Sequence, residues 1–394
     1  MNGLGDVAVV GLGVTDMTHR VYGSGRDFAA EALALALADA GLDKSDLDGL
    51  LVHGNQTADS SPELANALGL RELRLFSVMY AAGAGAGGML QYAAMAIGAG
   101  LVDTVALVFS DAPLRPRAKA SSTQYGGAPS RTPEGWDYLP FVHGDFGVAV
   151  SGYALAAQRH MDLYGTTSEQ LGAIAVAQRA WAQLNPAAQM RKPMTLSDHQ
   201  SSRLVVEPLH LFDCCLVSNG AVALVLTSGA RARDLPQPPV YLRSVVQSHP
   251  GDDGTGDRDG MLVTGASRAG PAALRAADLE LSDITLLQLY DCFTYTVLVT
   301  LEDLGFCGKG EGGAFVADGK LGPGGSLPTN TGGGQLSSFY MWTFTQLSEA
   351  VIQGRGQAGE RQVARNDHIL VSANGGILRN HASIVMSPHR GART

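Results

Sequence analysis

The chain of 394 residues has 45% hydrophobic residues, 16% charged residues and 50 glycines, a composition that excludes a disordered protein. This length exceeds one ordinary hydrophobic core, so two domains or two halves of one large fold are expected. A net charge of −9 without a basic run argues against nucleic-acid binding, and no apolar run reaches the ~20 residues that span a membrane.

The beginning of the chain and its cysteines indicate a cytoplasmic protein. The first residues lack a basic segment followed by an apolar core and a cleavage site, so no signal peptide is expected. Cys214, Cys215, Cys292 and Cys307 show no metal-ligand spacing, and we expect reduced, structural thiols. The low charge and the many small residues also predict an oligomer.

Strand and helix patterns alternate through the first half of the chain. Helix patterns lie within residues 27–49, 61–70, 85–100 and, twice, 147–186, and strand patterns lie at 6–15, 47–54, 73–80, 103–112 and 218–228. Buried strands separated by helices are typical of a layered α/β sheet. Turn residues fill 113–140, which predicts a loop or lid, and 191–215 is expected to be mostly irregular.

A Pro-rich, charged stretch at residues 231–239 is the best boundary between two halves. It predicts units of 1–235, with a loop excursion at about 112–206, and 236–394. The second unit has a strand pattern at 239–248, a helix pattern at 271–284 and two strands around a glycine turn at 367–387. A duplicated architecture fits this alternation, although no residue-level repeat is legible.

The stretch 286–342 carries the most informative side chains of the second half. An apolar run ends at Tyr290 and Asp291, and a helical pattern follows. Glycines at 332–334 then lead into a second helical pattern that carries Tyr340. Both tyrosines are expected where regular structure meets a loop, which is where proteins commonly place chemistry.

Three long motifs resemble the thiolase superfamily and, within it, the sterol-carrier-protein-type thiolases. The family's central segment is similar to YGTTSEQLGAIAVAQRAWAQLNPAAQMRKPMT and SSRLVVEPLHLFDCCLVSNGAVALVLTS, and its "HDCF…GLCKKGEGG" segment is similar to LLQLYDCFTYTVLVTLEDLGFCGKGEGG. A strand–AAGAGAGG–helix unit stands where the family has its nucleophile elbow. The resemblance covers nearly the whole chain and implies a five-layered α-β-α-β-α thiolase fold of two similar halves.

The groups that a thiolase needs for covalent Claisen chemistry are missing from the matching positions. The elbow, residues 80–85, contains no cysteine. The family's Gly-His-Pro turn is replaced over 330–332 and the TGGGQLSSFYMW segment, and the last turn, 372–376, lacks the second cysteine. Cys214 and Cys215 lie in a different motif and are not substitutes. A covalent cysteine intermediate is therefore not expected.

The replacements resemble a narrower group, the lipid-transfer-protein-type aldolases of actinobacterial steroid side-chain degradation. Tyr290 takes the place of the histidine in "HDCF". The resemblance implies retro-aldol cleavage of a 17-hydroxy steroid carboxyl-CoA, a β-hydroxyacyl-CoA, to a 17-keto steroid and propionyl-CoA. It also implies a homodimer without its own cofactor or metal, and a partner with an OB-fold and a zinc ribbon from an acyl-CoA hydratase. An acyl-CoA-binding subunit that needs its partner for any chemistry, or a non-catalytic scaffold, are the alternatives.

A retro-aldol reaction needs proton carriers and donors for an enolate oxygen. Tyr290 and Tyr340 are the candidate proton carriers, and their order as base and acid stays open. Asp291 could orient a catalytic group or cap a helix, and His381 is expected to be structural. The candidate substrate-binding and oxyanion residues lie on two glycine turns and are Gly332, Gly333, Asn374, Gly375 and Gly376.

Overall fold

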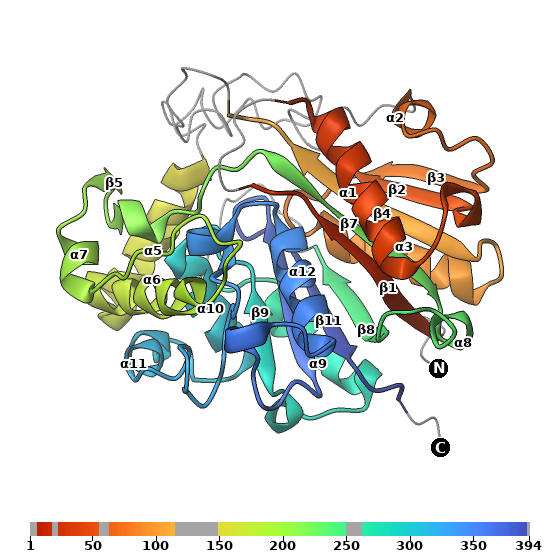
Figure 1. The fold of residues 1–394 in the computed structure, drawn as a ribbon. Coiled ribbons are helices and arrows are strands. Elements are labelled where there is room, and N and C mark those ends of the chain that lie inside the picture. Colours follow the sequence, from red (N-terminus) through yellow and green to blue (C-terminus); the bar gives the residue numbers. More distant parts are fainter. Residues whose placement is uncertain (1–5, 18–22, 55–62, 115–148, 250–261, 392–394) are drawn as a thin grey trace.

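The computed structural model describes residues 6–17, 23–54, 63–114, 149–249 and 262–391 (Figure 1). Within these ranges, one mixed sheet has the strand order β3-β2-β4-β7-β1-β8-β11-β10-β9. Its strands are β1 (Val7–Val14), β2 (Gly49–His53), β3 (Leu75–Met79), β4 (Thr104–Asp111), β7 (Gly220–Ser228), β8 (Val240–Ser248), β9 (Leu286–Leu289), β10 (Ile369–Gly375) and β11 (Asn380–Ser387). All the strand patterns expected from the sequence are present.

The sheet repeats one strand order on either side of a short junction. Strands β1 and β8 join the two sides through only two antiparallel pairs, Ala8 with Tyr241 and Val9 with Val240. Moving outward, β1-β7-β4-β2 corresponds to β8-β11-β10-β9, so the first and last strands of each half lie together. This correspondence supports the duplicated architecture, and we propose 1–235 and 236–394 as the two halves.

Helices cover both outer faces of the sheet and fill the space between its halves. Helix α1 (Gly25–Ala40) packs on β1, β7 and β4, whereas α9 (Ala266–Ala277) packs on β8 and β11, with α10 (Thr294–Leu304) beside it. Helices α3 (Gly85–Gly98) and α12 (Thr343–Gly354) contact strands of both halves (Figure 1). The order is therefore helix, strands, helices, strands, helices, and the five-layered fold predicted from the sequence is confirmed.

Local sequence signals explain where these helices begin and end. Ser24 and Asp27 form a capping box at the start of α1, and Gly41 ends it with a φ of 67°. Helix α12 is buried almost all round, and α3 begins with glycines because its first turn packs closely. A side chain at Gly87 would overlap Ala382 on β11.

A further group of helices lies beside α10. It consists of α5 (Ala149–Tyr164), α6 (Ser168–Gln183), α7 (Leu196–Gln200) and α11 (Gly312–Ala317), with the hairpin β5 (Leu204–Val206) and β6 (Leu209–His210). The expectation that 191–215 is mostly irregular was thus wrong in part, since short elements with few residues give a weak periodic signal. The loop expected at 113–140 lies almost wholly outside the described residues. Two further short α-helices are α2 (Glu63–Ala67) and α8 (Gly229–Ala232).

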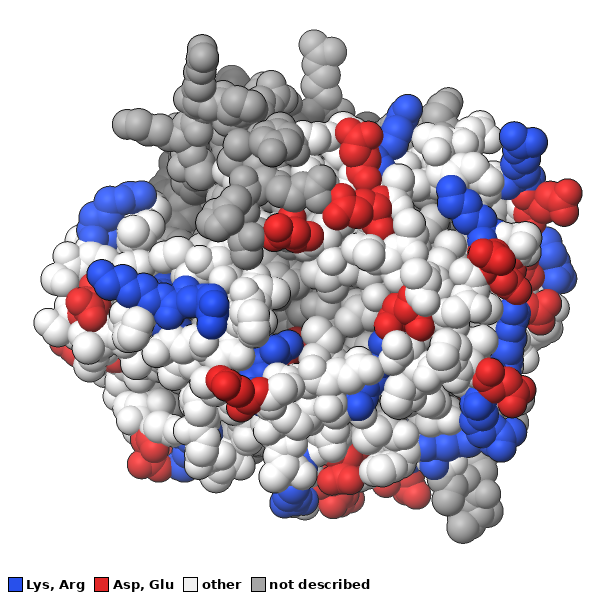
Figure 2. Space-filling view, viewed as in Figure 1, with Lys and Arg blue, Asp and Glu red and all other residues white. Residues whose placement is uncertain are grey.

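Charged side chains are spread over the surface without a concentration of one sign on the face in Figure 2, where wide uncharged areas separate them. Among the described helices, none has the length and apolar character needed to cross a membrane.

Candidate active site

The two candidate proton carriers meet. Tyr290 directly follows β9, and Tyr340 lies in the connection between the π-helical turn Gly334–Ser338 and α12. Their phenol oxygens are 3.2 Å apart and share a hydrogen bond. Tyr290 is 3% exposed, and Tyr340 is half-buried. The expected helical position of Tyr340 was wrong, because α12 begins three residues later.

Backbone contacts hold both tyrosines in place. The Tyr290 amide donates to the Ser372 carbonyl at 3.0 Å, which joins the end of β9 to β10. The Tyr290 carbonyl accepts from Thr296 Oγ1 at 2.9 Å. The Tyr340 amide donates to Ser218 Oγ at 3.0 Å, so a residue just before β7 fixes the second phenol.

Burial keeps both phenols protonated. It raises the pKa of Tyr290 well above its ordinary value of 10, with a further contribution from the neighbouring Cys292 thiol. It raises the pKa of Tyr340 well above 10 too, and the adjacent Tyr290 adds to the effect. The pair is therefore neutral at neutral pH, and neither phenol is a resting-state phenolate.

The turn before α3 lies against this pair. A side chain at Gly83 would overlap both the carbonyl oxygen of Asn374 and Cζ of Tyr290, so only glycine fits there. Ala82 has a φ of 49°. Thr343 at the start of α12 donates from its hydroxyl to the Gly83 carbonyl. The turn that resembles a nucleophile elbow thus lies close to the tyrosines. It carries no nucleophile, and its small residues let Tyr290 and the backbone of Asn374 pack against it.

The last strand turn contributes Asn374 and Gly375 to the same place. Asn374 is fully buried at the end of β10, and its Oδ1 accepts from the Tyr153 hydroxyl at 3.4 Å. Its Nδ2 has no hydrogen-bond partner among the described residues. A side chain at Gly375 would overlap the Gly83 amide, and Gly376 turns the chain with a φ of 64°.

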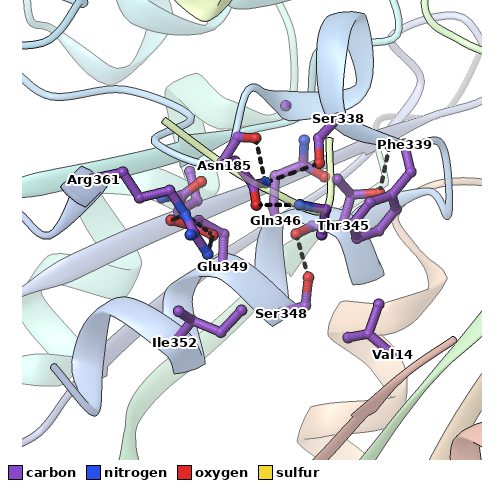
Figure 3. A pocket seen from close by; sticks show the side chains of 14 residues that line it. Val14, Asn185, Ser338, Phe339, Thr345, Gln346, Ser348, Glu349, Ile352 and Arg361 are labelled. Carbon is purple, nitrogen blue, oxygen red and sulfur yellow. Dashed lines mark hydrogen bonds and ion pairs between the residues drawn. The ribbon is translucent and has the colours of Figure 1, made fainter. Parts of the chain in front are cut away.

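Gly332 and Gly333 lie on a second glycine turn, with other neighbours. Gly332 packs against the Glu349 carboxylate and accepts from Asn185 Nδ2 at 2.8 Å. Gly333 donates its amide to the Asn330 carbonyl at 2.8 Å, so that N–H is already engaged. Gly332 borders a cavity of about 90 Å³, in which Figure 3 shows Glu349 paired with Arg361.

Asp291 holds the segment that leads to Tyr340. Its buried carboxylate accepts from the Gln335 amide at 2.9 Å, the Leu336 amide at 3.2 Å and Gln346 Nε2 at 2.6 Å. Burial raises its pKa from 3.8 to about 7, although these donors act in the opposite direction. Of the two roles expected for Asp291, it orients the turn before Tyr340, and no side-chain bond caps α10.

Sequence reasoning missed Tyr153, on α5, and the contact between Cys215 and Cys292. Tyr153 is 4% exposed and carries no signal beyond an ordinary apolar helix position. The Cys215 amide donates to the Cys292 carbonyl at 2.9 Å, which joins two motifs that are separate in the sequence. Burial raises the pKa of Cys292 above its usual range, so its thiol stays protonated. His381 is buried against Ser383, and burial lowers its pKa to about 3, which fits the expected structural role.

Comparisons with known proteins identify the family of the chain. The family model "Thiolase C-terminal domain-like" matches residues 252–388. The chain is 39% identical over 388 residues to the 17-hydroxy-3-oxo-4-pregnene-20-carboxyl-CoA lyase of Mycobacterium tuberculosis, covering 95% of this chain and 97% of that one. It is 38% identical over 394 residues to the steroid side-chain-cleaving aldolase of Thermomonospora curvata, covering 95% and 96%. The solved Ltp2-ChsH2(DUF35) aldolase superposes with a TM-score of 0.85 at 36% identity, covering 98% of this chain and 99% of that one. This chain therefore belongs to the steroid side-chain-cleaving aldolases of the thiolase superfamily.

Proposed function

We propose that the protein catalyses retro-aldol cleavage of a 17-hydroxy steroid carboxyl-CoA to a 17-keto steroid and propionyl-CoA, in sterol side-chain degradation. The hydrogen bond of 3.2 Å between the Tyr290 and Tyr340 phenols carries this proposal. The names of the two curated relatives support the reaction and the substrate class. The elbow without a nucleophile supports a route that forms no covalent intermediate.

The reaction needs no electron sink from the protein, because the substrate's thioester supplies one. The 17-hydroxyl loses its proton as the bond between that carbinol carbon and the carbon next to the thioester breaks. The hydroxyl carbon becomes the ketone, and the electron pair of the broken bond forms the thioester enolate. A proton added to the enolate carbon then gives propionyl-CoA.

The tyrosine pair suits a proton relay from the 17-hydroxyl oxygen to the enolate carbon. One phenol accepts the hydroxyl proton while it passes its own proton to the other phenol, which protonates the enolate carbon. Both phenols are neutral before and after turnover, as their raised pKa values require. Positioned proton transfer of this kind contributes about 10²–10⁴-fold to a rate.

The enolate oxygen needs donors that are aimed at it before the reaction begins. We assign the binding of the enolate oxygen to Asn374, Gly375 and Gly376, because they lie at the turn that packs against Gly83 and Tyr290. Gly332 and Gly333 are proposed to shape a neighbouring wall of the substrate site. The Glu349 cavity beside Gly332 and the engaged amide of Gly333 support a packing role over direct donation.

The expected assembly is a homodimer that also binds a second protein. Strand β3 is one edge of the described sheet. Exposed apolar side chains lie on it (Val78), directly after it (Tyr80) and on the neighbouring α3 (Tyr92 and Met95). An unpaired edge with such side chains favours pairing with another chain. The name of the Ltp2-ChsH2(DUF35) aldolase structure supports a DUF35 partner, which we propose to be the OB-fold, zinc-ribbon protein of an acyl-CoA hydratase. In this proposal the substrate brings the CoA, the partner holds the zinc, and the complex works in the cytoplasm.

The test is release of both products from a 17-hydroxy steroid carboxyl-CoA, with and without the DUF35 partner. Equal amounts of propionyl-CoA and 17-keto steroid are expected from the wild type. Tyr290→Phe and Tyr340→Phe are each expected to lower kcat by about 10²–10⁴-fold, with thermal unfolding and CoA-ester binding unchanged. Tyr241→Phe, which alters a buried tyrosine of β8, is the matched control.

Two outcomes would contradict the proposal. Wild-type rates in both tyrosine variants would remove the relay. Binding of the ester without product release in either condition would favour the alternative, an acyl-CoA-binding subunit or scaffold without its own chemistry.

A further inference from the structure

The carboxamide of Asn374 is fully buried and has an N–H donor, Nδ2, that makes no hydrogen bond within the described part of the chain. A buried polar group without a hydrogen bond costs about 1–3 kcal/mol, so native proteins rarely keep one without a use. The backbone carbonyl oxygen of Asn374 and the Tyr290 ring both border the position of a Gly83 side chain, and the Tyr153 phenol that contacts the carboxamide is also a neighbour of Tyr290. Asn374 therefore lies beside the tyrosine pair.

Tyr153 determines which end of this carboxamide faces the site. Its ring is packed against Phe293, with centroids 4.7 Å apart, so the direction of its hydroxyl is fixed. The hydroxyl donates to Asn374 Oδ1 at 3.4 Å, and its other neighbours are the backbone of Leu378 and the Cys292 thiol. A carboxamide held by its oxygen turns its nitrogen to the opposite side.

We propose that Tyr153 is a positioning residue for the aldolase reaction: its hydroxyl holds Asn374 Oδ1 so that Nδ2 donates to the thioester oxygen of the substrate. This inference rests on the proposed function and deepens it. The chain of contacts runs from α5 through Tyr153 to the end of β10, and Tyr153 itself touches no reacting atom. The thioester oxygen gains charge as the enolate forms, so a preset donor lowers the barrier more than it strengthens binding.

Kinetics of single and double variants test the chain of contacts. Asn374→Asp keeps the shape and removes the donor, and we expect kcat to fall by about 10²–10³-fold. Tyr153→Phe should lower kcat by about tenfold to a hundredfold with little change in KM, because the carboxamide is then free to turn. Adding Tyr153→Phe to Asn374→Asp should change nothing further. Tyr164→Phe, on the same helix, is the control and should keep wild-type rates.

A spectroscopic measurement separates positioning from a structural role. The Tyr290→Phe variant should bind the 17-hydroxy steroid carboxyl-CoA without rapid turnover, so the ester can carry a carbon-13 label at its thioester carbonyl. We expect a downfield carbonyl shift on binding, because Nδ2 polarises the carbonyl, and loss of that shift when Tyr153→Phe is added. Unchanged melting of Tyr153→Phe shows that the fold persists.

Three results would overturn the inference. One is a carbonyl shift that persists in Tyr153→Phe. Another is an equal loss of rate from Tyr153→Phe in the wild-type and Asn374→Asp backgrounds. The third is a bound ester with no shift at all. If the wild type binds the ester and does not cleave it, the proposed function fails, whereas the shift and its loss still decide the role of Tyr153.

Discussion

Two turns of the same shape lead into the two central helices, yet they carry different side chains. Before α3, Ala81 and Gly83 pair across Ala82, whose φ is 49°. Before α12, Met341 and Thr343 pair in the same way across Trp342, whose φ is 48°. The two turns touch where the Thr343 hydroxyl donates to the Gly83 carbonyl.

The comparison shows that the turn before α3 leaves room for neighbouring side chains, whereas the turn before α12 carries aromatic side chains itself. The first turn is small, so the Tyr290 ring and the Asn374 carbonyl can lie directly against Gly83. The second turn presents Tyr340 and packs Trp342 on Phe109, with ring centroids 5.2 Å apart. The same turn conformation thus occurs in both halves, and the side chains at each turn determine its role in the site.

The largest expected effect comes from filling the first turn. Gly83→Ala places a methyl group where it would overlap the Asn374 carbonyl and Tyr290, and overpacking against backbone costs about 1–3 kcal/mol or more. We expect a fall in melting temperature and a loss of most aldolase activity, because Tyr290 must move. Gly88→Ala is the control, since its methyl group would meet only the flexible ends of Gln247 and Met79. Equal, small effects of both variants would show that the first turn is not tightly packed.

The contribution of Asp291, which holds the segment before Tyr340, to the free energy of unfolding should depend on pH. Burial raises the pKa of Asp291 to about 7, so the folded state holds this proton more tightly than the unfolded state. Its stabilising contribution is complete below the unfolded pKa of 3.8 and is lost as the pH rises through 7, by up to about 1.4 kcal/mol for each pH unit within that window. Urea unfolding of the wild type and Asp291→Asn at pH 5, 6, 7 and 8 measures this.

The difference in unfolding free energy between wild type and Asp291→Asn should therefore decrease with pH up to about 7 and then level off. Other titrating groups are present in both proteins and cancel in the difference. A constant difference over the same range would mean that the amide donors from the π turn outweigh burial and keep the carboxylate ionised.

A smaller effect is expected from removing the contact between the two turns. Thr343→Val keeps the shape of the side chain and leaves the buried Gly83 carbonyl without this donor, which costs about 1–3 kcal/mol. Thr343→Ser keeps the hydroxyl and should retain more of the stability. Thermal unfolding of the two variants gives the comparison, and equal melting temperatures would show that the hydroxyl contributes nothing.

The sequence predicted one of these turns better than the other. The strand–glycine–helix unit before α3 was legible because glycines and an apolar helix follow one another locally. Tyr340 was expected in a helix, since the π turn Gly334–Ser338 before it has the same apolar content as a helical turn. Both outcomes follow from signals that lie within a few residues.

Contacts between segments that are distant in the sequence could not be predicted from such local signals. The tyrosine pair joins positions 50 residues apart, and the pair of Tyr153 and Asn374 joins positions 221 apart. Resemblance to a family pointed to the first pair. Nothing in the local pattern of α5 distinguishes Tyr153 from a core residue, and only the packed structure brings it to the end of β10.

The smallest expected effect concerns the strain that the two turns share. A non-glycine residue with a positive φ costs about 1 kcal/mol, and Ala82 has little side chain with which to offset this cost. Ala82→Gly should therefore raise the melting temperature by one to two degrees, whereas Ala81→Gly should lower it. Trp342→Gly relieves the same strain but removes the ring that packs on Phe109 and on His53, at centroid distances of 5.2 and 4.9 Å, so it should destabilise. Stabilisation by Ala82→Gly together with destabilisation by Trp342→Gly would confirm that the two turns share a backbone conformation and differ in how much their side chains contribute to stability. Destabilisation by both variants would mean that packing of the Ala82 methyl group against Gly375 stabilises the protein by more than the positive φ costs.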